Sequence, residues 1–347
     1  MIKIFDGHND TLLGLFRNSP TDFFQIQTSG HIDFPRALRG GFAGGFFALF
    51  TPSAIPSKAT SESTSQNPEP VFIEPITHHE ALTESLRLAA TLFRLERLSK
   101  GSFEVLRSID QLLECLESEK IGAILHLEGA EAIDADLNHL EVLYATGLRS
   151  LGIVWSRPNI FGTGVPISTF PATPDIGPGL TKQGKSLVSA CNELGIMIDL
   201  SHINEKGFWD VEAISNKPLV ATHSNSHSLC QSPRNLTDNQ LSAIAKTEGV
   251  VGVNFGVRFL REDGKSDTST PISQIINHVN YFVDTMGINH VAFGSDFDGT
   301  AIPKSLGDVQ GLPKLVDALR EAGYGDTDIK KIAFENWVRV LRTTWQR

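Results

Sequence analysis

The amino-acid sequence predicts an α/β protein built as a (β/α)8 TIM barrel. Three observations support this fold: eight short apolar runs recur along the chain, helical patterns separate them, and 347 residues suit one barrel with insertions. An open doubly wound sheet is the alternative, but it would normally have fewer strands and a glycine-rich phosphate turn. No G-x-G-x-x-G motif occurs in the sequence.

Eight runs rich in Val, Ile, Leu and Phe are predicted to be strands. Most lack clean polar alternation, as expected of parallel strands that are buried on both faces. The predicted strands are Ile2–Phe5, Gly44–Phe50, Ile121–Leu127, Ser150–Val154, Ile196–Leu200, Leu219–Thr222, Val250–Asn254 and His290–Gly294.

Helical periodicity fills the stretches between these strands. One helix is predicted to begin at Thr77, because Thr77 and Glu80 have the spacing of a capping box. An apolar face then follows, made of Leu82, Leu86, Ala89 and Phe93. The other predicted helices are Gly184–Leu194, Asp238–Thr247, Ile272–Met286 and Leu312–Ala322.

Residues 1–347 are expected to form a single domain with two long rim loops. Residues 51–75 are rich in Ser, Thr and Pro, and residues 158–180 are rich in Pro and Gly. They follow the second and fourth predicted strands, so in a barrel both would lie on the C-terminal rim, where active sites form. No second domain is apparent for 51–75 to connect, which favours a rim loop or lid over a linker.

Composition excludes several partners. A formal net charge of -10 argues against non-specific nucleic-acid binding. No apolar run approaches the roughly 20 residues that span a bilayer, and Asp6 and His8 come too early for a signal peptide. Cys115, Cys191 and Cys230 are few and widely spaced, so we expect small buried thiols in a reducing compartment. The expected location is cytoplasmic, with no membrane partner.

Six imidazole or carboxylate side chains lie at the C-terminal ends of predicted strands. They are His8 and Asp10 after the first strand, Glu128 after the third, His202 after the fifth, His223 after the sixth and Asp296 after the eighth. Any one alone would more often be a hydrogen-bonded rim residue or a helix N-cap. Together they fit two borderline divalent ions, because imidazole and carboxylate are the usual zinc ligands without thiolates. The predicted fold is therefore a barrel of the metal-dependent hydrolase type.

The remaining histidines are interpreted as structural. Those expected at the surface or at helix caps are His31, His78, His79, His139, His278 and His290. His126 lies within the third predicted strand, so we expect it to pack inside the barrel or to support a ligand. His227 is ambiguous, with a supporting or surface role favoured over a ligand role.

Several motifs along nearly the whole chain resemble the membrane (renal-type) dipeptidase family of zinc metallopeptidases. They are DGHNDTL, GGFAGGFFALFTP, HLEGAEAI, DLSH, THSNSHSLCQSPRNLTDNQL, GSDFDG and ENWVRVL. The resemblance is to bacterial-type soluble members, since the secretory signal and lipid-anchor tail of the animal enzymes are missing. Because family members are often dimers, a homodimer is one expected assembly.

The resemblance implies a binuclear zinc centre with two Zn²⁺ per chain. His8 and Asp10 with Glu128 would hold one ion, and Glu128 with His202 and His223 would hold the other. Asp296 matches the active-site aspartate that carries a proton and meets the substrate's amino group. Arg234 matches the arginine that binds the terminal carboxylate of the substrate.

The sequence departs from the animal enzymes at two places in the site. Trp155 and Ser156 stand near the histidine that contacts the tetrahedral intermediate, so Arg157, Asn159 or a metal would have to replace that contact. Gly256 stands where a tyrosine is expected.

The expected function is zinc-dependent hydrolysis of dipeptides, L-Xaa-L/D-Xaa, through a metal-bridging hydroxide. One alternative keeps the two metals but acts on a lactone, phosphoester, cyclic amide or N-acyl amino acid. The first strand carries H-x-D and Glu128 stands at the bridging position, which argues for the dipeptidase branch. Relatives in the wider metal-dependent hydrolase barrels instead usually have H-x-H on the first strand and often a carbamylated lysine as the bridge. A non-catalytic binding protein is the third hypothesis, and the complete ligand set argues against it.

Overall fold

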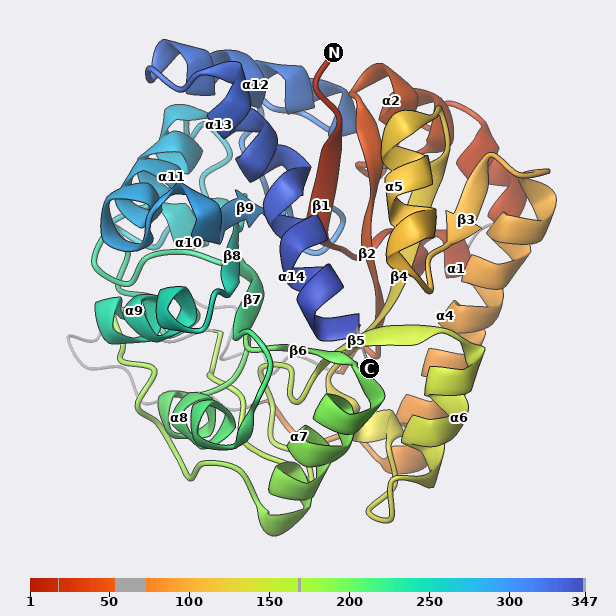
Figure 1. Cartoon of the computed structure of the whole chain (residues 1–347), viewed down its shortest axis with the longest axis vertical. Helices are drawn as coiled ribbons and strands as arrows, with labels where there is room; N and C mark the ends of the chain where they lie inside the picture. The colour runs from red at the N-terminus through yellow and green to blue at the C-terminus, as the bar shows by residue number, and fades with distance from the viewer. Residues whose placement is uncertain (18, 54–72, 168–169, 346–347) are drawn as a thin grey trace.

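The computed structural model shows eight parallel strands arranged as a barrel and surrounded by helices (Figure 1). The structure describes residues 1–17, 19–53, 73–167 and 170–345. The barrel strands are β1 (Ile4–Asn9), β2 (Phe42–Phe50), β4 (Ile121–Glu128), β5 (Leu148–Gly152), β6 (Met197–Asp199), β7 (Val220–Ser224), β8 (Val250–Val253) and β9 (Val291–Phe293). Each overlaps one predicted strand.

The barrel is nearly closed where β9 meets β1. The other strands pair in parallel in the order β1-β2-β4-β5-β6-β7-β8-β9. Across the seam the Asp296 amide donates to the His8 carbonyl oxygen at 3.0 Å, and the Asp10 amide donates to that of Phe297 at 2.8 Å. The predicted (β/α)8 barrel is confirmed. The seam also brings three residues of the predicted site, His8, Asp10 and Asp296, side by side.

Two strand details differ from the prediction. β1 runs through Asn9 rather than ending at Phe5, and all six of its residues are buried. The polar residues after Phe5 hid the rest of the strand from the sequence pattern. Asp6 can be buried in a strand because it accepts hydrogen bonds from the Ser295 amide and hydroxyl across the seam. In addition β3 (Phe103–Val105) pairs with β4 outside the barrel order. A run of three residues carries too little periodicity to be recognised.

Helices connect the strands and cover the barrel. The α-helices are α1 (Thr11–Arg17), α2 (Phe34–Arg39), α4 (His78–Leu98), α5 (Ile109–Glu117), α6 (Asn138–Thr146), α7 (Lys182–Leu194), α8 (Glu205–Ile214), α9 (Asp238–Lys246), α10 (Val257–Leu260), α11 (Ser273–Met286), α12 (Leu312–Glu321), α13 (Asp326–Lys330) and α14 (Asn336–Trp345). Short 3₁₀ turns are η1 (Pro20–Phe24), η2 (Ala130–Ala132), η3 (Ile288–His290) and η4 (Val309–Gly311), and η5 (Lys331–Glu335) is a π turn.

Helix α4 begins as predicted, and its predicted apolar face packs against the core except at Leu86. The Thr77 side chain accepts from the Glu80 amide, and the Glu80 carboxylate accepts from the Thr77 amide, which forms the capping box. The buried side chains are Ala81, Ser85, Leu88, Ala89, Thr91, Leu92 and Leu95. Leu86 is 50% exposed. Of the other predicted residues, Ala89 is buried, and Leu82 and Phe93 pack partly buried against the core. Only Leu86 was placed wrongly, because Leu occurs on both sides of this helix and sequence alone does not say which row packs most deeply.

The segment at residues 179–186, GLTKQGKS, matches the letters of a phosphate-binding P-loop. In a P-loop a strand precedes the glycine-rich turn and the helix begins at the Gly-Lys pair. Here α7 already begins at Lys182, with Thr181 as its N-cap, and no described strand leads into it. Lys185 pairs with Asp210 at 3.0 Å. The match is therefore one of letters only.

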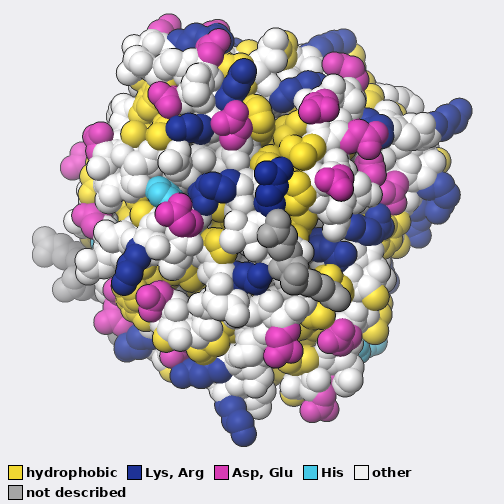
Figure 2. All heavy atoms as spheres, in the orientation of Figure 1, with side chains coloured by type: hydrophobic (Ala, Val, Ile, Leu, Met, Phe, Trp, Pro, Cys, Tyr) yellow, Lys and Arg dark blue, Asp and Glu magenta, His cyan; other side chains and the backbone are white. Residues whose placement is uncertain are grey.

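Apolar side chains fill the N-terminal end of the barrel and pack against α14. This helix crosses the strands in Figure 1. Trp337 on α14 is fully buried and donates to the Phe293 carbonyl oxygen at 3.1 Å. On this side of the molecule acidic and basic side chains are interspersed (Figure 2). Closure of this end leaves the opposite end, where the strands finish, for the site.

The predicted loops and other regions have mixed outcomes. Most of 51–75 lies outside the described residues. In 158–180 the Val165 amide donates to the His202 carbonyl oxygen at 2.9 Å, so this loop contacts the segment after β6. Cys115, Cys191 and Cys230 are buried and unpaired, as expected. Within the described ranges no helix has the length and apolarity to span a bilayer.

Candidate metal centre and substrate cavity

The first predicted ligand set gathers around His8. Its Nε2 atom lies 3.5 Å from Oδ2 of Asp10 and 3.5 Å from Oε2 of Glu128. His8 is held within β1, Asp10 follows it, and Glu128 ends β4, so two strand ends supply the three side chains. All three are buried, with His8 fully enclosed.

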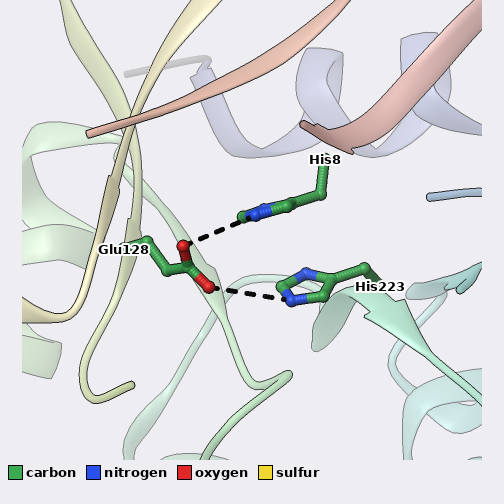
Figure 3. Close-up of side chains that lie close together, drawn as sticks. All are labelled: His8, Glu128 and His223. Atoms are coloured by element: carbon green, nitrogen blue, oxygen red, sulfur yellow. Dashed lines mark ion pairs between the residues drawn. The ribbon is translucent and has the colours of Figure 1, made fainter. Parts of the chain in front are cut away.

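The second predicted set gathers around the other oxygen of Glu128. Oε1 lies 3.1 Å from Nε2 of His202 and 3.8 Å from Nε2 of His223, and these two nitrogens are 3.1 Å apart. Figure 3 shows the Glu128 carboxylate between His8 and His223, with one oxygen directed at each ring. One carboxylate therefore faces both imidazole sets.

The donor atoms fit divalent ions in spacing and in chemistry. Two ligands on one tetrahedral zinc ion lie about 3.4 Å apart, given bonds of about 2.1 Å. The separations above, 3.1 to 3.8 Å, bracket that value. Both ring nitrogens of His8 and Oδ1 of Asp10 are buried without a hydrogen-bond partner. Buried polar atoms in this state are costly unless an ion or another partner satisfies them. The residues present fit a metal centre.

The charges also suit metal ions. Burial, followed by the neighbouring cationic charge, lowers the pKa of His202 to about 4 and that of His223 well below its usual value, so both rings are neutral, as a metal would require. Burial opposes charge on His8, but Glu128 and Asp10 outweigh it and raise its pKa. Burial and the charge of Glu128 raise the pKa of Asp10 to about 7. Crowded carboxylates of this kind need positive charge beside them.

Hydroxyl groups orient both imidazoles of the second set. Ser156 Oγ lies 2.9 Å from Nδ1 of His202. Thr222 Oγ1 donates to Asp199 at 2.6 Å and lies 2.8 Å from Nδ1 of His223, so it must accept its hydrogen bond from that nitrogen. This leaves the lone pair of His223 on Nε2, directed at Glu128 and His202. Ligand histidines are commonly fixed in this way.

Asp296 lies beside the first set. His8, Asp10 and Asp296 offer ligand atoms within 4.8 Å of one another. Asp296 Oδ2 accepts from Nδ2 of Asn254 at 2.8 Å, and burial raises the pKa of Asp296 to about 6. A methyl group at Gly299 would collide with carboxylate oxygens of Asp10 and Asp296. Glycine is therefore required for the chain to pass behind this pair.

Arg234 is buried at only 3% exposure and holds the backbone around the second set. Its Nη1 donates to the carbonyl oxygen of Ser201, and its Nη2 donates to that of His223 at 3.1 Å. Its Nε atom is buried without a partner. Since Arg234 also lines the cavity, the unused N–H groups are available to an anionic group of a ligand.

These groups share one cavity of about 330 Å³. Its lining side chains include Asp10, Glu128, His202, Arg234 and Asp296, together with Leu13, Phe50, Trp155, Ile167, Arg258 and Phe259. Apolar and aromatic walls with a few convergent charged groups are typical of small-molecule sites. All six residues predicted from strand ends therefore lie at or directly beneath one opening.

The family model of the membrane dipeptidases (peptidase family M19) matches residues 1–346. The chain belongs to the membrane dipeptidase family. The predicted family and the predicted enzyme class, a metallo-dipeptidase, are thereby confirmed, and a metal cofactor is implied. A protein from the pqqA 5′ region of Klebsiella pneumoniae is 47% identical over 258 residues, which cover 74% of this chain and 95% of that protein.

Two solved structures are similar to this dipeptidase over almost its full length. A metallopeptidase from Rhodobacter sphaeroides, liganded with a phosphinate mimic of the dipeptide L-Ala-D-Ala, is 45% identical, covers 99% of each chain and has a TM-score of 0.94. The M19 metallopeptidase dipeptidase AC is also 45% identical, covers 99% of each chain and has a TM-score of 0.95.

The positions at which this dipeptidase departs from the animal enzymes have clear structural roles. Trp155 lines the cavity, 4.9 Å from the ring of Phe50 and 5.8 Å from that of His202 between centroids. Arg157 is fully buried and pairs with Glu131 at 2.7 Å. Its Nη1 donates to the hydroxyl of the cavity-lining Ser53 at 3.2 Å, and its guanidinium lies over the rings of Phe50 and Trp155. The Asn159 side chain accepts from the Phe161 amide within its own loop. Neither Arg157 nor Asn159 is among the side chains that line the cavity.

Other histidines divide between expectation and correction. His126 is buried inside the barrel, with its ring 5.4 Å from that of His8, as expected. His227 bonds through Nε2 to the carbonyl oxygen of Ala172, 2.9 Å away. His278 was wrongly predicted at the surface, because it is fully buried on α11. Its Nδ1 accepts from the Ser226 amide and its Nε2 donates to the Leu260 carbonyl oxygen, both at 3.1 Å.

Some residues of the site were not identified from the sequence. Asp199 accepts from the amides and hydroxyls of both Ser201 and Thr222, and so ties β6 to β7 beside the two histidines. Asn254 holds Asp296. Both residues stand at ends of predicted strands, like the six predicted residues, but an aspartate or asparagine there is more often a cap.

Proposed function

We propose that this dipeptidase hydrolyses the amide bond of dipeptides, L-Xaa-L/D-Xaa, at a centre of two zinc ions. The observation that carries the proposal is the Glu128 carboxylate, whose two oxygens face different imidazole sets at the floor of the cavity. The same cavity exposes Arg234 and Asp296, a cation and an anion for the two charged ends of a dipeptide. The dipeptide mimic bound by the Rhodobacter sphaeroides enzyme supports this substrate class.

The proposed ligands follow the two groupings. His8, Asp10 and Glu128 would hold one ion. Glu128 with His202 and His223 would hold the other, so that Glu128 is shared. When bound, two such ions lower the pKa of a coordinated water to near neutrality and polarise the carbonyl group under attack. They would also stabilise the developing oxyanion.

Asp296 is the proposed proton carrier. Cations beside Asp10 and Glu128 would favour the charged form of Asp296, so it begins as an acceptor. It takes a proton from the attacking water and passes it to the amine nitrogen as the carbon–nitrogen bond breaks. The products are one amino acid with a new carboxylate and one with a free amino group. Asn254, bonded to Oδ2, fixes the carboxylate while its other oxygen acts.

Arg234 is the proposed anchor for the terminal carboxylate of the substrate. Two of its nitrogens donate to the carbonyl oxygens of Ser201 and His223, and its unpaired Nε–H lies on the same edge of the planar guanidinium as one N–H of Nη2. That pair of N–H groups matches the two oxygens of a carboxylate. The substrate would therefore be oriented against the same backbone that carries His202 and His223.

The test is a substrate panel with zinc-loaded enzyme. Dipeptides of L-L and L-D configuration are compared with lactones, cyclic amides and N-acyl amino acids, with release of amino acids followed by chromatography. We expect zinc-dependent cleavage of dipeptides and little turnover elsewhere. Preferential turnover of a lactone or an N-acyl amino acid would contradict the proposal and favour the alternative binuclear hydrolase.

A further inference from the structure

A second arginine lines the substrate cavity besides Arg234. Arg258 on α10 contributes to the wall of the 330 Å³ cavity. Its Nη2 donates to the Ile167 carbonyl oxygen at 2.7 Å, which fixes the guanidinium beside the 158–180 loop. The side chain is only partly buried, so its remaining N–H groups stay open to a ligand.

No carboxylate of the described residues pairs with Arg258. The nearby cavity carboxylates have other partners: Asp10 and Glu128 face His8, and Asp296 accepts from Asn254. Asp298 accepts from the Thr11 hydroxyl and the His31 amide. A partly desolvated guanidinium without a counter-charge is unfavourable, and a bound anion would remove that cost.

The position of Arg258 relates it to one end of the substrate. Arg234 and Arg258 both contact the ring of Phe259, with guanidinium carbons 5.6 and 5.7 Å from the ring centroid. If Arg234 holds the terminal carboxylate, the residue bearing that carboxylate lies next to Phe259 and Arg258. The side chain of the same residue is then the substrate group within reach of Arg258.

We propose that Arg258 binds a carboxylate on the side chain of the C-terminal residue, so that the enzyme prefers dipeptides ending in Asp or Glu. This inference rests on the proposed dipeptidase function and specifies its substrate class. An acidic side chain gives Arg258 a charge-assisted hydrogen bond, which the corresponding amide makes only weakly. A site built to pair a charged group also rejects the analogue that leaves it unpaired.

The experiment compares isosteric substrates. Values of kcat/KM are measured for Ala-Asp against Ala-Asn, and for Ala-Glu against Ala-Gln, with wild type, Arg258→Gln and Arg258→Lys. We expect wild type to prefer each acid by roughly 10- to 100-fold, as for a charge-assisted contact. Arg258→Gln should abolish the preference and leave the amide substrates almost unchanged. Arg258→Lys should keep part of it, because the charge remains while the fork is lost.

Arg261→Gln is the matched control. Arg261 follows in the same segment but pairs with Asp263 at 2.6 Å outside the cavity, so this variant should keep the wild-type preference. Equal kcat/KM for acid and amide in wild type would overturn the inference while leaving the dipeptidase proposal intact. So would an Arg258→Gln variant that loses activity equally on all four substrates, since Arg258 would then serve the terminal carboxylate. Absence of cleavage for every dipeptide would overturn both proposals.

Discussion

Ser156 Oγ lies 2.9 Å from Nδ1 of His202, on the ring nitrogen opposite the one that faces Glu128. The serine stands in the segment where the animal enzymes carry a histidine that contacts the intermediate. In this chain the segment instead supports a proposed ligand through Ser156 and supplies an aromatic wall through Trp155. This segment therefore both supports a proposed ligand and lines the cavity.

Replacing Ser156 by alanine should weaken the second metal site. The hydrogen bond that fixes the His202 ring would be lost, and losses of this kind typically lower metal affinity by about 10- to 100-fold. Zinc affinity is measured by competition with a chromophoric chelator. Ser150→Ala is the control, because Ser150 bonds in the same way to His126, which is not a proposed ligand. Equal losses in both variants would contradict the assigned role.

Asp296→Asn should remove turnover while metal binding is retained. The amide keeps the size of the side chain but cannot accept and return the proton, so kcat should fall by roughly 10²- to 10⁴-fold. Zinc content and dipeptide turnover are measured on the same preparation. Wild-type kcat in the variant would show that another group carries the proton, and loss of zinc would show that Asp296 is a ligand.

Arg234→Lys should show whether Arg234 binds the substrate or only holds the backbone of Ser201 and His223. A lysine keeps the charge but not the fork, so kcat/KM for dipeptides should fall by about 10- to 100-fold. The comparison substrate is a dipeptide amide, which lacks the terminal carboxylate. If Arg234 binds that carboxylate, the variant should lose much less on the amide than on the acid. Equal losses on both would assign Arg234 to the backbone of Ser201 and His223 alone.

The buried His278 should make the protein less stable in mild acid. Burial lowers its pKa to about 4, whereas the pKa of a histidine in the unfolded chain is about 6.5. Between these values the unfolded chain binds the proton more readily, so stability is present above about pH 6.5 and is lost as the pH falls towards 4. The contribution is on the order of 3 kcal/mol. His278→Asn should flatten this part of the curve of unfolding free energy against pH. A curve with the wild-type slope would contradict the assignment.

Much of the fold was predictable because its signals are local. Buried parallel strands have few polar letters, and helices such as α9 begin at side-chain caps like Thr237 that are visible in the sequence. The burial of α4 at Leu88 rather than Leu86 was not predictable, since it depends on which neighbours pack against the helix. The short β3 likewise owes its existence to pairing with β4.

Site residues could be predicted where they stand at strand ends that a barrel brings together. Residues whose burial depends on a contact distant in sequence could not be predicted. His8, Glu128 and His223 follow from strand ends that a barrel must bring together. The burial of His278 depends on the loop after β7, far away in sequence. Arg258 carries no motif, and only the cavity makes it notable. The single-domain organisation and the homodimer stay predictions.

Metal stoichiometry in wild type and Glu128→Gln tests the central claim most directly. After removal of metal with a chelator, zinc is titrated back and bound equivalents per chain are determined by mass spectrometry. Two equivalents in wild type, with activity following the second, are the expected result. In Glu128→Gln at most one equivalent should bind tightly, because the shared carboxylate is gone. Wild-type saturation at a single equivalent, or two tightly bound equivalents in Glu128→Gln, would contradict the account.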